Sequence, residues 1–187
     1  MNREDFSQLH QELKRARFDH IDYISIKRRR KLMGEFRKEA EATFKTFCSM
    51  LDQIGWKYDT DVSDLSITTT AVGEDLPMEM HIFMDEDAGR MLVLSQLPVK
   101  MSEEKRIDAA IVINHFNWCR MIGCLDYDVT TGRIMYRLST CFADAVVGEA
   151  LCGVLLKSSI EIVDKFNDQF LMLNKGMLTM EQMIENM

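Results

Sequence analysis

Proline, glycine and cysteine are all scarce in this sequence. Two prolines and nine glycines among 187 residues exclude a collagen-like or low-complexity filament. The five cysteines are odd in number and form no Cys-x-x-Cys pair, so neither a zinc site nor a dithiol redox motif is indicated. We expect the cysteines to be small buried hydrophobes in a reducing compartment.

The chain also lacks a long apolar run. No stretch approaches the ~20 residues that cross a bilayer, so no membrane span is expected. The N-terminus is charged from Arg3 onward and has no apolar core of a secretory signal. A cytoplasmic location is the expectation. Hydrophobic residues at 47% and charged residues at 28% predict a folded domain, alone or with an appendage.

Motifs for catalysis and for ligand binding are missing as well. Neither a Walker pattern nor a dinucleotide-binding glycine pattern occurs, and no pair of the four histidines has a metal-ligand spacing. We therefore predict no cofactor, no metal and no catalytic residues. One enzymatic alternative remains open, a small-molecule-binding or hydrolytic site near Asp126 and Asp128, which share one strand face.

Charge is distributed unevenly along the chain. Residues 1–40 carry 11 Lys/Arg and 7 Asp/Glu, whereas the remaining 147 residues carry 12 and 23. An acidic body repels phosphates, which disfavours nucleic acid as the partner. The alternative function, a nucleic-acid-associated regulator, depends on one candidate anion-binding run: Lys27, Arg28, Arg29, Arg30 and Lys31.

Hydrophobic periodicity gives the elements of the first half. Residues 4–17 read as a short helix, and residues 29–54 as a long one with an apolar stripe and Gly55 as its C-cap. The period then changes to two over residues 65–71, 78–85 and 90–97, which predicts three strands with the last closing at Pro98.

Two predicted hairpins share one pattern, in which Asp, four loop residues ending in Gly, and Arg follow one another. In the first, pairing Asp85 with Arg90 places Ile82 opposite Val93 on a core face. The same register places Phe83 with Leu92, and His81 with Leu94, on the second face of the sheet. That second face is apolar in part, which a fully solvated face need not be.

The second half predicts a helix, a hairpin and a long helix. Ser102 begins a helix that runs through Ile107, Ile111, Asn114 and Trp118 to Gly123. The second hairpin covers residues 124–138 with Asp128 opposite Arg133, and a long helix starts at Asp144 and stops before Gly176. The expected fold is α+β, with helices packed on one face of a twisted, mostly antiparallel five-stranded sheet in the order α-β-β-β-α-β-β-α. We therefore divide the chain into three predicted segments: an N-terminal helical extension over 1–28, the α+β domain over 29–176 and a tail helix over 177–187.

The tail is rich in methionine, of which the chain has 15. Thr179 and Gln182 have the spacing of a capping box that opens a short helix. Its apolar stripe consists of Met180, Met183, Ile184 and Met187. A helix this short is not stable alone in water, so we expect the stripe to dock on its own domain, a second subunit or a client.

The stretch from Ile111 to Gly176 resembles the YbjN-type family of bacterial sensory transduction regulators. The resembling residues are Asn114-His115-Phe116-Asn117-Trp118, Leu125-Asp126-Tyr127-Asp128, Gly132-Arg133-Ile134 and Leu173-Asn174-Lys175-Gly176. The resemblance implies a fold similar to type III secretion chaperones, which are dimers that bind extended client segments on apolar patches. It carries no catalytic residue over to this chain.

The sequence therefore predicts a non-enzymatic protein-binding module, a chaperone-like or regulatory adaptor that forms a homodimer and holds a protein partner. The candidate partner-binding residues on the sheet are Phe83, Leu92 and Leu94, an apolar patch of the kind such binding needs. Those on the tail are Met180, Met183, Ile184 and Met187, because flexible thioethers suit varied apolar partners.

Overall fold

The computed structural model describes residues 36–73, 76–145 and 147–187. The basic run 27–31, the predicted helix over 4–17 and the start of the predicted helix at residue 29 lie outside the described residues. Contacts divide the chain into two units, Met1–Met33 and Gly34–Met187, and the fold described below is that of the second. None of the helices in the described part combines the length and the apolar character needed to span a bilayer.

Six antiparallel strands of the described residues form one sheet in the order β1-β2-β3-β4-β6-β5. The strands are β1 (Tyr58–Asp61), β2 (Ser66–Val72), β3 (Pro77–Asp85), β4 (Arg90–Lys100), β5 (Cys124–Asp128) and β6 (Arg133–Cys141). The helices are α3 (Arg37–Gln53), α4 (Arg106–Cys119), α5 (Glu149–Asn174) and α6 (Met180–Glu185), and the 3-10 turn η1 (Glu103–Lys105) precedes α4.

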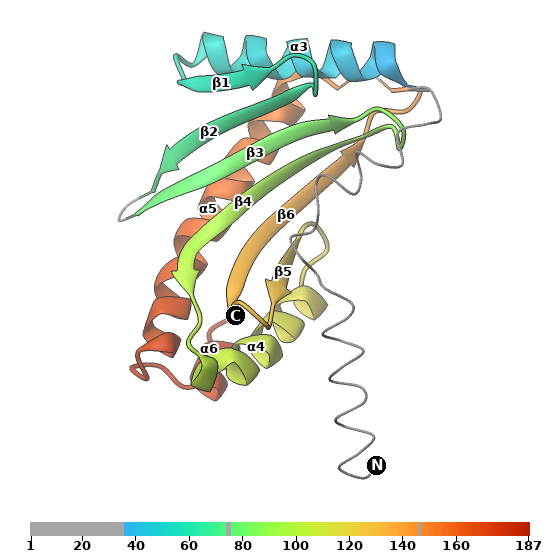
Figure 1. Cartoon of the computed structure of the whole chain (residues 1–187). Helices are drawn as coiled ribbons and strands as arrows, with labels where there is room; N and C mark the ends of the chain where they lie inside the picture. The colour runs from blue at the N-terminus through green and yellow to red at the C-terminus, as the bar shows by residue number, and fades with distance from the viewer. Residues whose placement is uncertain (1–35, 74–75, 146) are drawn as a thin grey trace. The chain divides into compact units, whose positions relative to one another are not determined.

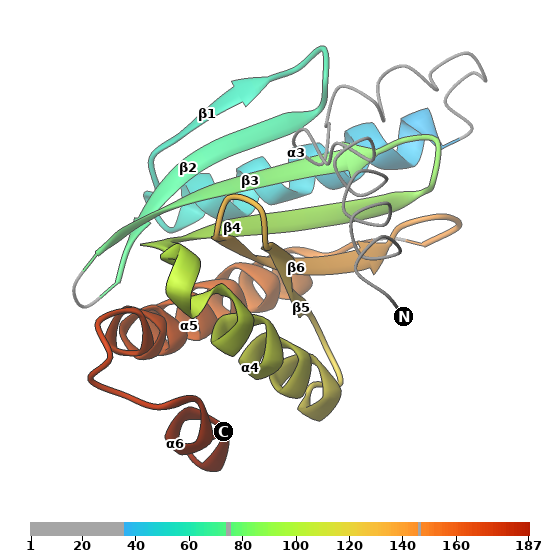
Figure 2. The same cartoon turned by 60° about the horizontal axis from the view of Figure 1, so that its bottom comes forward.

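The helices cover one face of the sheet, and the core lies between them. α3 lies near β1, β2 and β3, α5 crosses behind the sheet, and α4 and α6 lie at the end that holds β5 (Figures 1 and 2). Ile82 and Val93 from the sheet and Phe47 and Phe170 from α3 and α5 are each at most 1% exposed in the same cluster. The predicted α+β class is confirmed.

The sheet has six strands, so the prediction of five is wrong. The missed strand is β1, a four-residue strand of largely exposed residues at the edge of the sheet. Because only one side chain of β1 is even half-buried, it shows no alternation of apolar and polar residues. A turn-forming Asp61, which accepts hydrogen bonds from the Ser63 and Asp64 amides at 2.9 and 3.3 Å, closes the β1–β2 hairpin.

Three predicted boundaries also differ. β4 continues through Pro98 to Lys100. This last part lies beyond its final pair with β3, at Ser95, and its register with β6 is irregular between Gln96 and Lys100. A proline there removes no ladder hydrogen bond. The last helix begins at Glu149, whereas Asp144 has a positive φ of 53° in the preceding loop. The middle helix ends at Cys119 and not at Gly123.

Both predicted hairpin registers are present in the structure. Asp85 lies opposite Arg90 and forms an ion pair with it at 3.2 Å, and Asp128 lies opposite Arg133. At the second turn Gly132 has a φ of 79°, and a Cβ there would lie 2.2 Å from the Met101 carbonyl oxygen. Only glycine fits this position, where the Gly132 carbonyl accepts a hydrogen bond from the Met101 amide at 2.8 Å and so joins the β5–β6 turn to the end of β4.

Candidate protein-binding surfaces

The second sheet face carries the first group of predicted partner-binding residues. Phe83 on β3 and Leu92 on β4 are register partners, and Leu94 lies opposite His81. The three side chains are 7%, 8% and 7% exposed, yet none belongs to the core cluster on the other face. The structure brings them together as predicted, and their role in binding a partner stays a prediction.

The tail residues predicted to bind a partner pack against their own domain. The Thr179 hydroxyl accepts from the Gln182 amide at 3.2 Å, and the Gln182 side chain accepts from the Thr179 amide at 2.9 Å, which completes the capping box. Met183 is fully buried in the core cluster. The other three tail residues are half-buried against that cluster: Met180, Ile184 and Met187. Their outer sides alone are open to a partner.

α4 is held to the domain by one face. Its buried residues are Ala109, Val112, Ile113 and Phe116. The Phe116 ring makes edge contacts with Phe166 of α5 at 4.9 Å and with Tyr136 of β6 at 6.3 Å between centroids. Asn117 adds a polar clamp on edge strand β5, because its side chain accepts from the Leu125 amide at 2.8 Å and donates to the Leu125 carbonyl at 3.0 Å.

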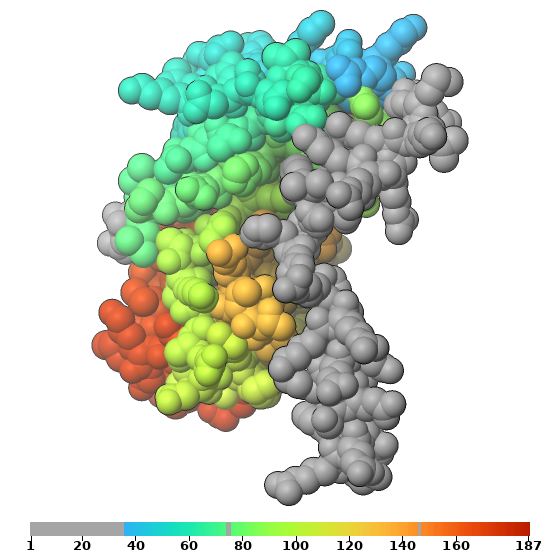
Figure 3. All heavy atoms as spheres, in the orientation of Figure 1, coloured from blue at the N-terminus to red at the C-terminus, as the bar shows by residue number. Residues whose placement is uncertain are grey.

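The opposite side of α4 exposes a row of large apolar side chains, which we call the α4 stripe. Its members and their exposed fractions are Ile107 (64%), Ile111 (44%) and Trp118 (86%) on the helix, followed by Met121 (100%) and Ile122 (70%) in the bend after it. Figure 2 shows α4 on the outside of the domain with no other labelled element in front of it, and Figure 3 shows the start of α4 at the surface. A contiguous apolar row of this kind marks an interaction surface.

Sequence reasoning traced the helix through these residues without recognising that they face outward. The signal was present, since α4 is apolar on two opposite faces, 109/112/113/116 and 107/111/118. A helix that is apolar on both sides is either enclosed or shares its second side with another chain. The sequence did not show which of the two faces the domain covers.

Charged groups lie at the two ends of the α4 stripe. Glu103 and Glu104, at its start, are exposed, and Lys105 is engaged with Asp108 at 3.0 Å. Arg120, just past the end of the helix, is exposed with its guanidinium carbon 4.9 Å from the Phe116 ring centroid. Arg120 therefore lies against the buried face of α4 and not on the stripe, and Glu103 pairs with Arg106 at 3.8 Å.

The carboxylates considered for hydrolysis are both engaged in structural bonds. Asp126 accepts two hydrogen bonds from the Arg137 guanidinium at 2.6 and 2.9 Å. Asp128 accepts hydrogen bonds from the hydroxyls of Thr130 and Thr131, each at 2.6 Å. Burial acts to raise the pKa of Asp128, but these hydrogen bonds, with those from the amides of the same residues, outweigh it and lower the pKa. The lowered pKa of Asp128 is unsuited to a general acid, and Asp126 is occupied by its ion pair with Arg137.

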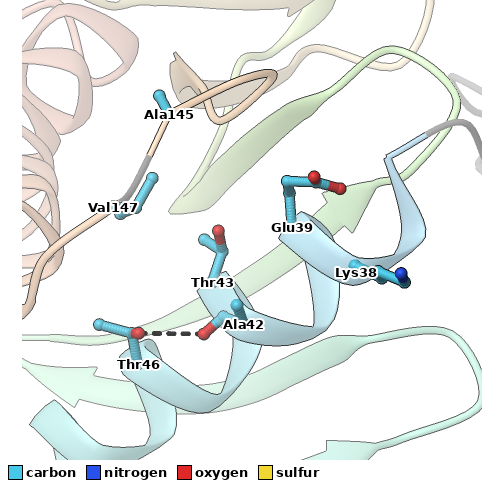
Figure 4. Close-up of a pocket in the computed structure, with 7 residues that line it drawn as sticks. All are labelled: Lys38, Glu39, Ala42, Thr43, Thr46, Ala145 and Val147. Carbon is cyan, nitrogen blue, oxygen red and sulfur yellow. Dashed lines mark hydrogen bonds between the residues drawn. The ribbon is translucent and has the colours of Figure 1, made fainter.

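Two other features offer little chemistry. A surface pocket of about 250 Å³ between α3 and the loop before α5 is lined by Lys38, Glu39, Ala42, Thr43, Thr46, Ala145 and Val147 (Figure 4). The Thr46 hydroxyl in this pocket donates a hydrogen bond to the Ala42 carbonyl at 2.9 Å.

His115 and Cys119, which the sequence analysis did not pair, lie on the surface of α4 with 3.5 Å between Nε2 and Sγ. Across the described ranges no three metal-ligating side chains gather.

Comparisons with known proteins identify the fold and no family. No family model matches the chain, and no curated protein matches it. A chain of the crystal structure of the ExsC–ExsE complex aligns with a TM-score of 0.50 at 11% identity, covering 69% of this chain and 93% of that one. A chain of the HopA1–SchA chaperone–effector complex aligns with a TM-score of 0.48 at 10% identity, covering 68% and 95%, and this score adds no support. The first likeness shows the fold, whereas membership of the YbjN-type family stays a prediction.

Proposed function

We propose that this chain is a non-enzymatic protein-binding module that acts as a chaperone-like or regulatory adaptor. The observation that carries the proposal is the α4 stripe, in which five apolar side chains between 44% and 100% exposed lie on α4 and in the bend directly after it. Each buried Ile or Met contributes about 1.5–3 kcal/mol relative to an exposed one. A second polypeptide that covers the row is thus strongly favoured over water.

The fold supports the same function. One solved chain with this fold was crystallised in the ExsC–ExsE complex, which is an analogy at the level of the fold. The acidic body, with 23 Asp/Glu against 12 Lys/Arg after residue 40, keeps exposed apolar surface from causing indiscriminate self-association, because like-charged bodies repel one another.

The sheet face and the tail extend the proposal to a client. The half-buried side chains of Met180, Ile184 and Met187 would contact the client at the tail. Phe83, Leu92 and Leu94 are at most 8% exposed, so they would contact the client only once that sheet face is uncovered. Arg137 and Asp126 lie on the sheet face beside Leu94, since Leu94 and Arg137 are register partners. They provide charged groups that would select the client's polar residues at the edge of the patch.

A capture experiment with matched variants tests the proposal. The full chain, its Trp118→Glu variant and its Val154→Glu variant are each used to recover proteins from native lysate, and recovered proteins are then tested pure. Val154 is 59% exposed on α5, so its variant controls for adding an acid to an exposed apolar helix position. We expect Trp118→Glu to weaken binding at the stripe by about 30-fold or more, as for an aromatic hot spot.

The proposal fails if the wild-type chain is strictly monomeric and recovers no protein that binds it when pure. It also fails if Trp118→Glu and Val154→Glu bind every recovered protein, including a second copy of the chain, as well as wild type does. Circular dichroism of both variants establishes that they are folded before binding is compared.

A further inference from the structure

The second sheet face has an apolar centre that is nearly covered within a single chain. Phe83, Leu92 and Leu94 are at most 8% exposed, although the helices of the described residues lie on the other face (Figure 2). Register partners share a face of a sheet, and the two rows across this centre are Asp61-Ser66-Phe83-Leu92-Ser139 and Asp59-Thr68-His81-Leu94-Arg137. The apolar centre therefore lies on a face that carries acids at the β1 edge.

The residues before α3 join the domain at one end of this face. The Phe36 amide donates to the Glu86 carbonyl at 3.1 Å in the β3–β4 loop, and Arg37 forms an ion pair with Glu86 at 2.7 Å. Phe83 is three residues from Glu86 along β3, which is about 10 Å at the rise of a strand. The ten residues between position 26 and Phe36 span up to about 35 Å when extended. The residues before 27 can therefore reach the whole apolar centre.

The sequence of residues 18–31, which lie outside the described residues, complements this face. Its first part is rich in apolar side chains, namely Phe18, Ile21, Tyr23, Ile24 and Ile26. The basic run 27–31 follows directly and would come closer to the β3–β4 loop, which reads Asp85-Glu86-Asp87. Apolar side chains thus match the centre of the face, and bases match its acidic border.

We infer that residues 18–26 of the same chain, which we call the docking segment, occupy the second sheet face, with the run 27–31 against its acidic border. This goes beyond the proposed function, because the occupant is part of the chain itself. A segment held by a short linker has an effective concentration of the order of millimolar. A second copy at micromolar concentration is about a thousandfold more dilute, so the chain's own segment is favoured. A client that binds this face has to displace it.

A peptide of residues 18–31 added to the full-length chain tests the docking. In one form of the chain Ile21→Glu and Ile24→Glu together weaken its own docking segment, because each places an acid against the apolar centre. We expect the peptide to bind this double variant about tenfold or more tightly than it binds wild type, where the tethered segment competes. Adding Leu94→Glu to the double variant should abolish binding. Leu13→Glu alone, which lies outside the docking segment, should bind the peptide as weakly as wild type.

Disulfide formation identifies the occupant by a second route. Leu94→Cys is combined separately with Ile21→Cys and with Ile24→Cys, in a background that carries Cys119→Ser and Cys141→Ser because Cys119 and Cys141 are exposed. We expect mild oxidation to close a disulfide within one chain in at least one of the two pairs, seen as a monomer band that migrates faster without reductant. A disulfide between two chains would instead double the mass and make a second copy the occupant, which overturns the inference.

Other results also overturn the inference. They are a peptide that fails to bind the double variant, binds wild type equally well, or still binds after Leu94→Glu. Loss of peptide binding on adding Trp118→Glu would place the peptide on the α4 stripe and has the same consequence. So has the absence of an intrachain disulfide in both pairs, or equal crosslinking of Leu94→Cys with Leu13→Cys. Circular dichroism shows which variants are folded, and the disulfide result decides if Leu94→Glu is not.

Failure of this inference and failure of the proposed function are distinguishable. The capture experiment on the α4 stripe does not involve the docking segment, so a failed peptide or disulfide test leaves the proposed function standing. A monomeric chain that recovers no protein, while peptide binding and the intrachain disulfide are as expected, removes the proposed function and leaves the docking in place.

Discussion

Single residues in this protein are explained by their surroundings more than by their type. Ser95 occupies a core position of β4, opposite Met80, where the alternation of the strand calls for an apolar side chain. Its hydroxyl lies 2.6 Å from the hydroxyl of Ser159 on α5, and both residues are fully buried. Each serine therefore satisfies the other, and the pair aligns α5 with the sheet.

Cys152 provides a prediction about pH at the residue scale. The thiol is fully buried on α5, and burial raises its pKa from 9.0 to about 11. Because the folded-state pKa lies above the unfolded one, the folded state holds the proton more tightly. This contribution to stability is fully present below the unfolded pKa and is lost as the pH rises through the folded pKa. We expect the free energy of unfolding of wild type to fall more steeply between pH 9 and pH 11 than that of Cys152→Ala.

Urea denaturation at a series of pH values measures this difference. Cys152→Ala has a lower stability at neutral pH because it leaves a small cavity, so the comparison concerns slopes and not absolute values. Cys119→Ala, at an exposed position, should keep the wild-type slope. Parallel curves for wild type and Cys152→Ala would refute the prediction.

At the scale of elements, the sequence predicts those whose burial pattern is regular. The β3–β4 register followed from Asp85, Arg90 and two alternating strands, and the tail helix from the Thr179–Gln182 capping box. β1 was missed because a short edge strand buries too little to leave a pattern. The outward face of α4 was missed for the opposite reason, since both of its faces are apolar and periodicity cannot tell a core face from an interface.

The tail helix gives a prediction at this scale. Met183 is fully buried in the core cluster although α6 has only six residues. Replacing a buried methionine by alanine leaves a cavity and costs about 2–5 kcal/mol, so we expect Met183→Ala to lower the free energy of unfolding of the full chain by that amount. Glu181→Ala, at an exposed position of the same helix, should change it by less than about 0.5 kcal/mol.

Denaturant titrations of the three proteins compare these values directly. The two substitutions share a helix, so a difference between them reports packing and not helix propensity. If Met183→Ala changes the free energy of unfolding as little as Glu181→Ala, α6 does not contribute to the stability of the domain in solution. Its apolar stripe would then be available to a client, as the sequence analysis allowed.

At the scale of the whole molecule, one sheet face is used for the domain's own core and the chemistry-bearing side chains are used for structure. Asp126 pairs with Arg137, Asp128 holds the β5–β6 turn, and Asn117 caps the edge strand β5. The exposed apolar side chains of the α4 stripe have no such structural role. The predicted homodimer would bury that surface against a second copy and so link the stability of the domain to its own concentration.

This linkage predicts a melting temperature that depends on protein concentration. When unfolding is coupled to dissociation, mass action favours the folded dimer as the concentration rises. With an unfolding enthalpy of about 0.7 kcal/mol per residue, a dimer of two 187-residue chains should gain about 4 °C in melting temperature for each 100-fold rise in concentration. Calorimetry or circular dichroism over that range measures the slope. Val154→Glu should keep it, whereas Ile111→Glu should melt at one temperature throughout. A wild-type chain that also melts at one temperature would show that the α4 stripe does not hold two copies together as the chain unfolds.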